Sequence, residues 1–345
     1  MALKIVVADD SALMRKVIAD ILRTDPELEI VGIAKNGEEA IRLVKEKSPD
    51  VLTLDMNMPD KNGIDVIKEV MKENQTPILV ISALTQEGSK STMEALAAGA
   101  IDFIAKPSGE ISVNLTDLKD DIIKKVKVVG AAQVKKMEIK GKKAARQAFN
   151  PTRKKVILIG ASTGGPQTIE AILTQLPRNI PAPILVVQHM PGGEFTKMFA
   201  DRLKRLCEID VREAQQGDEL KDGLALIAPG GMHMKLEAEV EGAEGTIQLT
   251  LDPPELGVRP CVNHLFRSAS NIFKENTIGV ILTGMGSDGK EGCRIIKDLH
   301  GTVLAEAAES CIVFGMPKEV INANLADEIL TLEKIPVALL QLMEI

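Results

Sequence analysis

Apolar runs and helix-length segments alternate five times in the first 121 residues. The apolar runs are short, rich in Val, Ile and Leu, and nearly free of charge, as expected of strands buried on both faces. They are 4–8, 29–34, 51–54, 77–81 and 102–106. The helical segments begin near Ala12, Gly37, Gly63, Gly88 and Leu115. Strict alternation of this kind predicts a five-stranded parallel sheet with helices on both faces.

A second alternating pattern begins at Lys155 and fills the rest of the chain. Its predicted strands are 156–160, 183–188, 224–230, 279–284 and 301–306. Between Met234 and Leu251 the hydrophobic period changes to two around a glycine-containing turn, which is typical of an antiparallel hairpin. We therefore predict a doubly wound, mostly parallel α/β domain with an added hairpin.

The segment that joins the two patterns has a different composition. Twelve Lys and Arg residues lie between Lys124 and Lys155, with Glu138 the single acidic residue among them. Hydrophobic positions are too sparse there for a core, so a solvated tether is the favoured interpretation; contact with acidic protein or nucleic acid is the alternative. The predicted parts are a domain over 3–121, a basic linker over 122–151 and a domain over 152–345.

Composition excludes several classes of protein. The net charge of −7 argues against a nucleic-acid partner, and the absence of Trp and Tyr nearly excludes stacking on bases. No apolar run approaches the roughly 20 residues that span a bilayer, and the start of the chain has the pattern of a strand rather than a signal peptide. We therefore expect no membrane insertion and a cytoplasmic location. The four cysteines lack C-x-x-C spacing, which favours reduced thiols over disulfides or a metal site.

Polar residues follow the predicted strands of the first domain. They are Asp9, Asp10, Asp55, Ser82 and Lys106. Because the carboxyl ends of parallel strands meet at one edge, these side chains are expected to converge. Three carboxylates repel one another unless a cation lies among them, and their hard oxygen atoms favour Mg²⁺. A lysine and a hydroxyl can bind phosphoryl oxygens, so the set predicts a phosphoryl site, although each residue alone could be a cap or a surface charge.

Four motifs of this region resemble the receiver domain of two-component response regulators. They are ADDS (8–11), LDMNMPDKNG (54–63), ISAL (81–84) and KPS (106–108). The resemblance implies a flavodoxin-like order for the five-stranded sheet, and it implies that Asp55 accepts a phosphoryl group from a histidine kinase. It also implies that Asp10, Asp55 and the Asn57 carbonyl hold Mg²⁺ with support from Asp9, and that Lys106 and Ser82 sense the phosphoryl group. Phe103 falls where receivers often carry a switching aromatic residue; an ordinary core Phe is the alternative.

The second domain opens with the sequence VILIGASTGGP over 156–166. A strand leads into Ser162, and the following Gly-Gly permits a sharp turn before Pro166 starts a helix. Such a turn presents a hydroxyl beside exposed backbone N–H groups. It suits a nucleophile with an oxyanion hole and equally suits a phosphate cradle, so this stretch alone leaves both open.

Ser162, His189 and Asp288 each follow a predicted strand of the second domain. A serine needs a base to become nucleophilic, an imidazole can serve as that base, and an aspartate can orient the imidazole. Their order along the chain differs from the usual α/β-hydrolase order of Ser, Asp, His. His233 competes with His189 for the role of base. Ser162 as a helix cap and Asp288 as a turn residue are the structural alternatives.

Five further motifs resemble the methylesterase domain of the CheB family of chemotaxis receptor methylesterases, over about 152–345. They are GASTGGP (160–166), QHMP (188–191), APGGMHM (228–234), TGMGSDG (283–289) and FGMP (314–317). The resemblance implies a triad of Ser162, His189 and Asp288, and an oxyanion hole formed by the backbone N–H of Met285 with Thr163 beside the serine. It implies no cofactor for the esterase.

The two resemblances together imply an enzyme of bacterial chemotaxis. It would hydrolyse γ-methyl esters of glutamate on the cytoplasmic helices of methyl-accepting chemoreceptors, release methanol, and be activated by phosphorylation of Asp55. Deamidation of receptor glutamines would be a second activity. A hydrolase for another ester and a second domain that only binds a phosphorylated ligand are the alternatives. The lack of a Lys or Arg near Ser162 argues against the latter.

Overall fold

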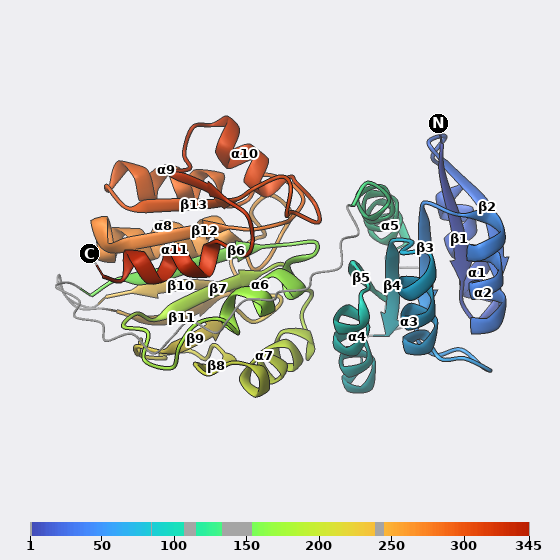
Figure 1. The fold of residues 1–345 in the computed structure, drawn as a ribbon, viewed down its shortest axis with the longest axis horizontal. Helices are drawn as coiled ribbons and strands as arrows, with labels where there is room; N and C mark the ends of the chain where they lie inside the picture. Colours follow the sequence, from blue (N-terminus) through green and yellow to red (C-terminus); the bar gives the residue numbers. More distant parts are fainter. Residues whose placement is uncertain (1, 84, 107–114, 133–153, 239–244, 345) are drawn as a thin grey trace. The chain divides into compact units, whose positions relative to one another are not determined.

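The computed structural model describes residues 2–83, 85–106, 115–132, 154–238 and 245–344. The chain divides into two compact units, Met1–Lys136 and Met137–Ile345, which are treated separately below (Figure 1). Four predicted features lie wholly or partly outside the described residues: position 84 of the ISAL motif, positions 107–108 of the KPS motif, the linker from 133 to 151, and the hairpin turn within 239–244.

The first unit contains a five-stranded parallel sheet in the order β2-β1-β3-β4-β5. Its strands are β1 (Leu3–Ala8), β2 (Leu28–Ala34), β3 (Val51–Asp55), β4 (Ile78–Ala83) and β5 (Asp102–Lys106). Its helices are α1 (Ala12–Leu22), α2 (Gly37–Lys47), α3 (Gly63–Glu73), α4 (Gln86–Ala98) and α5 (Leu115–Gly130). The predicted flavodoxin-like sheet is confirmed. Helix α5 extends through residues 122–130, so the predicted linker begins within a helix.

Local sequence explains these elements. All five residues of β3 are buried, which accounts for its unbroken apolar run. Four helices begin at a side-chain cap that accepts a hydrogen bond from a backbone N–H of the first turn. The caps are Ser11, Asn36, Asn62 and Thr85. Helix α1 packs on α5, whereas α2, α3 and α4 pack in sequence, as right-handed crossovers from a central first strand require.

The second unit contains a seven-stranded sheet in the order β14-β13-β12-β6-β7-β9-β8, and each neighbouring pair is parallel. Its strands are β6 (Val156–Ala161), β7 (Ile184–Gln188), β8 (Asp210–Glu213), β9 (Leu224–Ile227), β12 (Thr277–Ile281), β13 (Thr302–Glu306) and β14 (Glu328–Leu330). Its helices are α6 (Gly165–Leu173), α7 (Phe195–Leu206), α8 (Val262–Phe273), α9 (Lys290–Asp298), α10 (Met316–Asn322) and α11 (Ile335–Leu342), with a short 3-10 turn, η1 (Lys274–Asn276).

Two strands form a separate antiparallel pair, β10 (His233–Glu237) and β11 (Thr246–Thr250), which confirms the added hairpin. The predicted doubly wound sheet is also confirmed, but strands β8 and β14 were not predicted. Both lie at sheet edges, where burial is incomplete and strands are often short. The sequence of β8, Asp-Val-Arg-Glu, carries too little apolar signal to be recognised.

The strand orders place one reversal point in each unit. In the first unit, β1 lies between β2 and β3, so successive connections leave it in opposite directions. In the second unit, β6 lies between β7 and β12 in the same way. Ligands of open α/β sheets bind beyond the strand carboxyl ends at such points. No helix among the residues described is long and apolar enough to cross a membrane.

Candidate functional site

The reversal point of the first unit gathers acidic side chains around one lysine. Lys106 Nζ lies 3.0 Å from Asp9 Oδ2 and 2.9 Å from Asp55 Oδ1. Carboxylate oxygens of Asp9, Asp10 and Asp55 all lie within 4.8 Å of one another. Asp9 and Asp55 are buried, while Asp10 is exposed. The predicted convergence of these four side chains is therefore present, and the oxygen donor set fits a hard divalent cation.

Burial changes the pKa values of the charged groups in this acidic cluster. Burial raises the pKa of Asp55 and outweighs the lowering effect of Lys106, and the nearby charges of Asp9 and Asp10 raise it further. For Lys106, burial alone would lower the pKa, but Asp55 and Asp9 outweigh it and raise the value. One lysine thus compensates three carboxylates only in part, which leaves room for a further cation.

Three other predicted receiver residues lie near these strands. Ser82 is buried, and its hydroxyl donates to the Gly88 carbonyl oxygen at 3.0 Å, an interaction that anchors α4. Asn57 is exposed just after β3. The Phe103 side chain is buried, and the Lys125 ammonium group lies 5.6 Å from its ring centroid. The phosphate-sensing role of Ser82 and the switching role of Phe103 remain predictions.

The turn after β6 holds Ser162 between two strands. Its backbone N–H donates to the Thr283 carbonyl oxygen at 3.0 Å, and its own carbonyl oxygen accepts from Gly165 N at 2.8 Å. Gly164 has a φ of +78°, a conformation that favours glycine. Ser162 is half-buried in the turn that precedes α6.

His189 and Asp288 meet directly. His189 Nε2 lies 2.8 Å from Asp288 Oδ2, and both side chains are largely buried. Because an ionised carboxylate only accepts hydrogen bonds, Nε2 carries the proton. In the neutral ring Nδ1 is then the basic nitrogen. Within the described part of the chain no hydrogen bond joins Ser162 Oγ to His189, and such bonds commonly tighten only when substrate binds.

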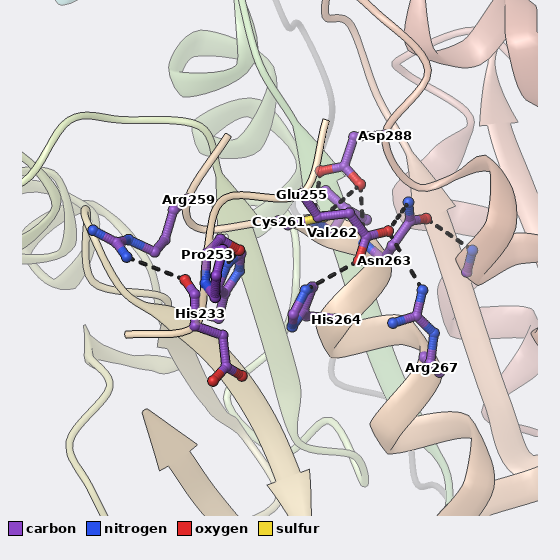
Figure 2. A network of polar contacts seen from close by, with 12 residues as sticks. His233, Pro253, Glu255, Arg259, Cys261, Val262, Asn263, His264, Arg267 and Asp288 are labelled. Carbon is purple, nitrogen blue, oxygen red and sulfur yellow. Dashed lines mark hydrogen bonds and ion pairs between the residues drawn. The ribbon is translucent and has the colours of Figure 1, made fainter. Parts of the chain in front are cut away.

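Asp288 is held by the start of α8, as Figure 2 shows. Its carboxylate accepts hydrogen bonds from the backbone N–H of Val262 at 2.6 Å and of Asn263 at 3.0 Å, and from Cys261 Sγ at 3.1 Å. Burial would raise its pKa, but the bond to His189, the positive charge that this ring carries when protonated, and these donors lower it. Asp288 is therefore a fixed anion that orients His189.

A close approach brings the turn after β12 against Ser162. A Cβ on Gly284 would lie 2.7 Å from Ser162 Cβ, so only glycine fits. This contact places Met285, the next residue, beside the serine turn. The side-chain hydroxyl of Thr283 donates to the Thr163 carbonyl oxygen at 3.0 Å, which ties the two turns together. The predicted oxyanion residues Met285 and Thr163 thus flank Ser162, while their role remains a prediction.

Two buried residues of this site were missed from sequence. Gln188 Nε2 donates to the carbonyl oxygens of Ser162 at 2.8 Å and His189 at 3.1 Å, and so bridges the two turns. Glu306 Oε2 accepts from Thr283 N at 2.8 Å, and its complete burial raises its pKa. A polar residue at the end of each apolar run, at Gln188 and Glu306, was the only available signal.

His233 occupies a different environment. Its Nε2 lies 3.2 Å from the Pro253 carbonyl oxygen, and its ring stacks on His264 with centroids 3.9 Å apart. Burial and the neighbouring His264 lower its pKa. No carboxylate pairs with His233 among the residues described, whereas His189 has Asp288. The geometry therefore favours His189 as the base.

Comparisons with known proteins agree with both halves of this description. The family model of the CheB methylesterase matches residues 157–339, and that of the response regulator receiver domain matches residues 5–115. In structure, the chain resembles the crystal structure of the Thermotoga maritima CheB methylesterase catalytic domain, with a TM-score of 0.52 and 46% identity. That similarity covers 55% of this chain and 100% of the solved one.

Full-length relatives share both domains. A protein of Halalkalibacterium halodurans is 46% identical over 335 residues, which cover 96% of each chain. Proteins of Pyrococcus abyssi and Thermotoga maritima are each 43% identical, covering 99% of this chain and 94% and 98% of their own. All three carry the name protein-glutamate methylesterase/protein-glutamine glutaminase. The chain belongs to the CheB methylesterase family and carries a response regulator receiver domain in front of the catalytic domain.

Proposed function

We propose that this chain is a protein-glutamate methylesterase, controlled by phosphorylation of its receiver domain, that also deamidates protein glutamines. The observation that carries the proposal is the hydrogen bond of 2.8 Å between His189 and the ionised Asp288, beside the turn that presents Ser162. Its substrates are the cytoplasmic helices of methyl-accepting chemoreceptors, so its place of action is the cytoplasm. The residue roles below are part of this proposal.

Acylation uses the basic nitrogen that His189 leaves free. Ser162 Oγ attacks the γ-carbonyl carbon of the methyl ester while its proton passes to Nδ1 of His189. The resulting oxyanion accepts hydrogen bonds from the turn of Thr163 and from the Met285 N–H. The ester C–O bond then breaks, and methanol leaves with the proton from Nδ1. Asp288 stabilises the imidazolium without taking its proton, consistent with its lowered pKa.

Deacylation repeats these steps with water. Nδ1 removes a proton from water as the oxygen attacks the acyl-enzyme, and Ser162 leaves with that proton. The product is a free glutamate side chain. A glutamine amide follows the same route, with ammonia as the first leaving group, so one site supports both activities.

Regulation begins at the acidic cluster. A bond forms between an Asp55 oxygen and phosphorus as the P–N bond of the kinase phosphohistidine breaks. Asp9, Asp10, Asp55 and the Asn57 carbonyl would hold Mg²⁺, which when bound neutralises phosphoryl oxygens. Lys106 already contacts Asp55 at 2.9 Å and offers its ammonium group to the new phosphoryl oxygens.

The test measures methanol release from methylated chemoreceptor fragments, with and without a small phosphodonor and Mg²⁺. The proposal expects release that increases with the phosphodonor and stops in the Ser162→Ala variant. A panel of unrelated esters runs alongside. Hydrolysis of those esters without release from the receptor fragments would point to another esterase, and no hydrolysis at all to a binding domain.

A further inference from the structure

A second polar cluster lies behind Asp288 at the start of α8 (Figure 2). Glu255, Cys261 and His264 each place one ligand atom within 4.8 Å of the others. Cys261 precedes α8 and His264 follows in its first turn, a C-x-x-H spacing that puts both on one face of the helix. Glu255 comes from the preceding loop, and its Oε2 lies 3.0 Å from His264 Nε2.

We propose that Glu255, Cys261 and His264 form a zinc site whose occupation inhibits the esterase. Thiolate, imidazole and carboxylate are the donors that Zn²⁺ binds, and three protein ligands with one open position are a common arrangement. Binding forms a Zn–S bond and breaks the S–H bond of Cys261, and the proton goes to solvent. Zn²⁺ also replaces the direct contact between Glu255 and His264 by a bond to each.

Further polar groups surround this zinc cluster. Asp288 Oδ1 lies 3.1 Å from Cys261 Sγ, so a second carboxylate faces the sulfur. Glu255 Oε1 is held by Asn263 Nδ2 at 3.0 Å, which leaves its other oxygen directed at His264. Cys261 is a neutral thiol that donates to Asp288, and Arg267 Nη2 lies 3.4 Å from Glu255 Oε1, so a metal ion enters by displacing the thiol proton and by sharing Glu255 with this arginine.

The two stacked rings fix the orientation of His264 beside this zinc cluster. His233 is fully buried, and His264 is 12% exposed at its side chain. Within the described residues, Nδ1 of each ring is buried without a hydrogen bond. Because His264 faces Glu255 through Nε2, that nitrogen is the one offered to the metal, and Nδ1 stays unpaired in the part of the chain that the structure describes. Stacking at 3.9 Å also holds the plane of His264, which prepares a ligand for a metal.

Exposure shows how an ion would enter. Cys261 has no exposed surface, whereas the side chain of Glu255 is 29% exposed. A cation therefore meets Glu255 and His264 first and the sulfur last. The zinc cluster therefore opens to solvent at Glu255 and is closed at Cys261 by the start of α8.

Inhibition of the esterase follows because Asp288 contacts both Cys261 of the zinc cluster and His189. Once the thiol proton is lost, the hydrogen bond from Cys261 to Asp288 disappears, and a divalent cation lies next to that carboxylate. Negative charge on Asp288 then stabilises the cation rather than the His189 imidazolium, so the rate of acylation falls. This consequence rests on the proposed esterase function, whereas metal binding itself does not.

Binding is tested with Co²⁺ added to the full-length protein, because a cobalt–thiolate bond absorbs in the near ultraviolet. The acidic cluster of the receiver contains no sulfur and gives no such band. We expect a band in the wild type that Zn²⁺ abolishes by displacement. Cys261→Ser, which keeps a hydroxyl donor for Asp288, should lose the band. His264→Gln and Glu255→Gln should each weaken apparent affinity by about tenfold or more.

Cys207→Ser is the matched control, since Cys207 lies after α7 and outside the zinc cluster. It should keep the band of the wild type. A wild type without the band would overturn the site. A band that survives His264→Gln at full affinity would place the metal on other residues, and would equally overturn it.

The regulatory part is tested by methanol release with increasing Zn²⁺, each variant being normalised to its own metal-free rate. We expect a fall of about tenfold or more in the wild type, reversed by a chelator, and no fall in Cys261→Ser. Equal inhibition of both proteins would show that Zn²⁺ acts elsewhere. A wild type that releases no methanol without metal contradicts the esterase proposal, while the cobalt band still decides the zinc site.

Discussion

The two reversal points use one architecture for opposite electrostatic purposes. In the first unit, three carboxylates share one lysine, and burial raises the pKa of Asp55. In the second, a single carboxylate receives several donors, and the pKa of Asp288 is lowered. The acidic cluster is thus short of positive charge and poised to respond to a cation and a phosphoryl group. In the second unit, hydrogen-bond donors already stabilise the negative charge of Asp288 before substrate binds.

The largest expected effect is the loss of methanol release in Ser162→Ala, a variant that should still be phosphorylated at Asp55. Ser162→Ala removes the nucleophile, so methanol release should fall roughly 10³-fold or more, with only the contribution of the oxyanion hole left. Phosphorylation of Asp55 should be unchanged, because the acidic cluster is intact. Initial rates together with phosphorylation assays measure both. A variant that keeps more than a tenth of the activity would contradict the assignment of Ser162.

A comparison of two histidines tests the pairing with Asp288. His189→Ala should cost about as much as Ser162→Ala, and the double variant little more, since members of a triad act as a unit. His233→Ala should retain far more activity, because its ring contacts Pro253 and His264 instead. An active His189→Ala protein beside an inactive His233→Ala protein would reverse the assignment.

Removal of the receiver tests whether it restrains the esterase. The segment from 131 to 155, between α5 and β6, reaches at most about 3.3 Å per residue, a length that would let the receiver lie against the esterase domain. A restraint of 1.4 kcal/mol changes the free population about tenfold. We therefore expect a fragment that starts near Pro151 to release methanol about tenfold faster than the unphosphorylated full-length protein. A slower fragment would mean that the receiver contributes to activity instead.

The smallest expected effects concern the free energy of unfolding, which should change in opposite directions in Asp288→Asn and Asp55→Asn. The lowered pKa of Asp288 means that its ionised form stabilises the fold above its unfolded pKa, near 4, and that this stability is lost as pH falls through the folded value. Asp288→Asn should therefore lower the free energy of unfolding at pH 7, by about 2 kcal/mol. The raised pKa of Asp55 has the opposite sign: its charge costs stability above the unfolded pKa, so Asp55→Asn should be stabilising at pH 7.

Denaturant unfolding of the two variants and the wild type, at pH 7, at pH 4 and at a series of lower pH values, measures these effects. The difference between wild type and Asp288→Asn should be nearly complete at pH 4, where folded Asp288 is still ionised, and should shrink only as pH falls further towards the lowered folded pKa. A destabilising Asp55→Asn at pH 7 would show that the contacts with Lys106 outweigh burial, which contradicts the described electrostatics.

Strand positions were predictable, since each central strand is a short apolar run that ends at a polar residue. The strands β8 and β14 were not, because partly exposed edges carry little apolar signal. Likewise, the ends of β6, β7 and β12 indicated Ser162, His189 and Asp288. The choice between His189 and His233 needed tertiary contacts, because nothing in either local sequence shows which ring meets a carboxylate.

The residues that support the site through hydrogen bonds could not be predicted from sequence either, because their contacts also depend on the tertiary fold. Gln188 and Glu306 act through hydrogen bonds to distant backbone, which no local pattern encodes. The zinc cluster was also invisible, because the cysteines lack C-x-x-C spacing and Glu255 joins Cys261 and His264 only through the fold.

The central claim is that phosphorylation of Asp55 in the acidic cluster increases the esterase activity of the second unit. Initial methanol release by the full-length protein, with and without a small phosphodonor in the presence of Mg²⁺, tests it most directly, with Asp55→Ala measured in parallel. The account predicts that the phosphodonor raises the wild-type rate about tenfold and leaves Asp55→Ala at its basal rate. A wild-type rate that ignores the phosphodonor, or an Asp55→Ala protein that responds to it, would contradict the claim.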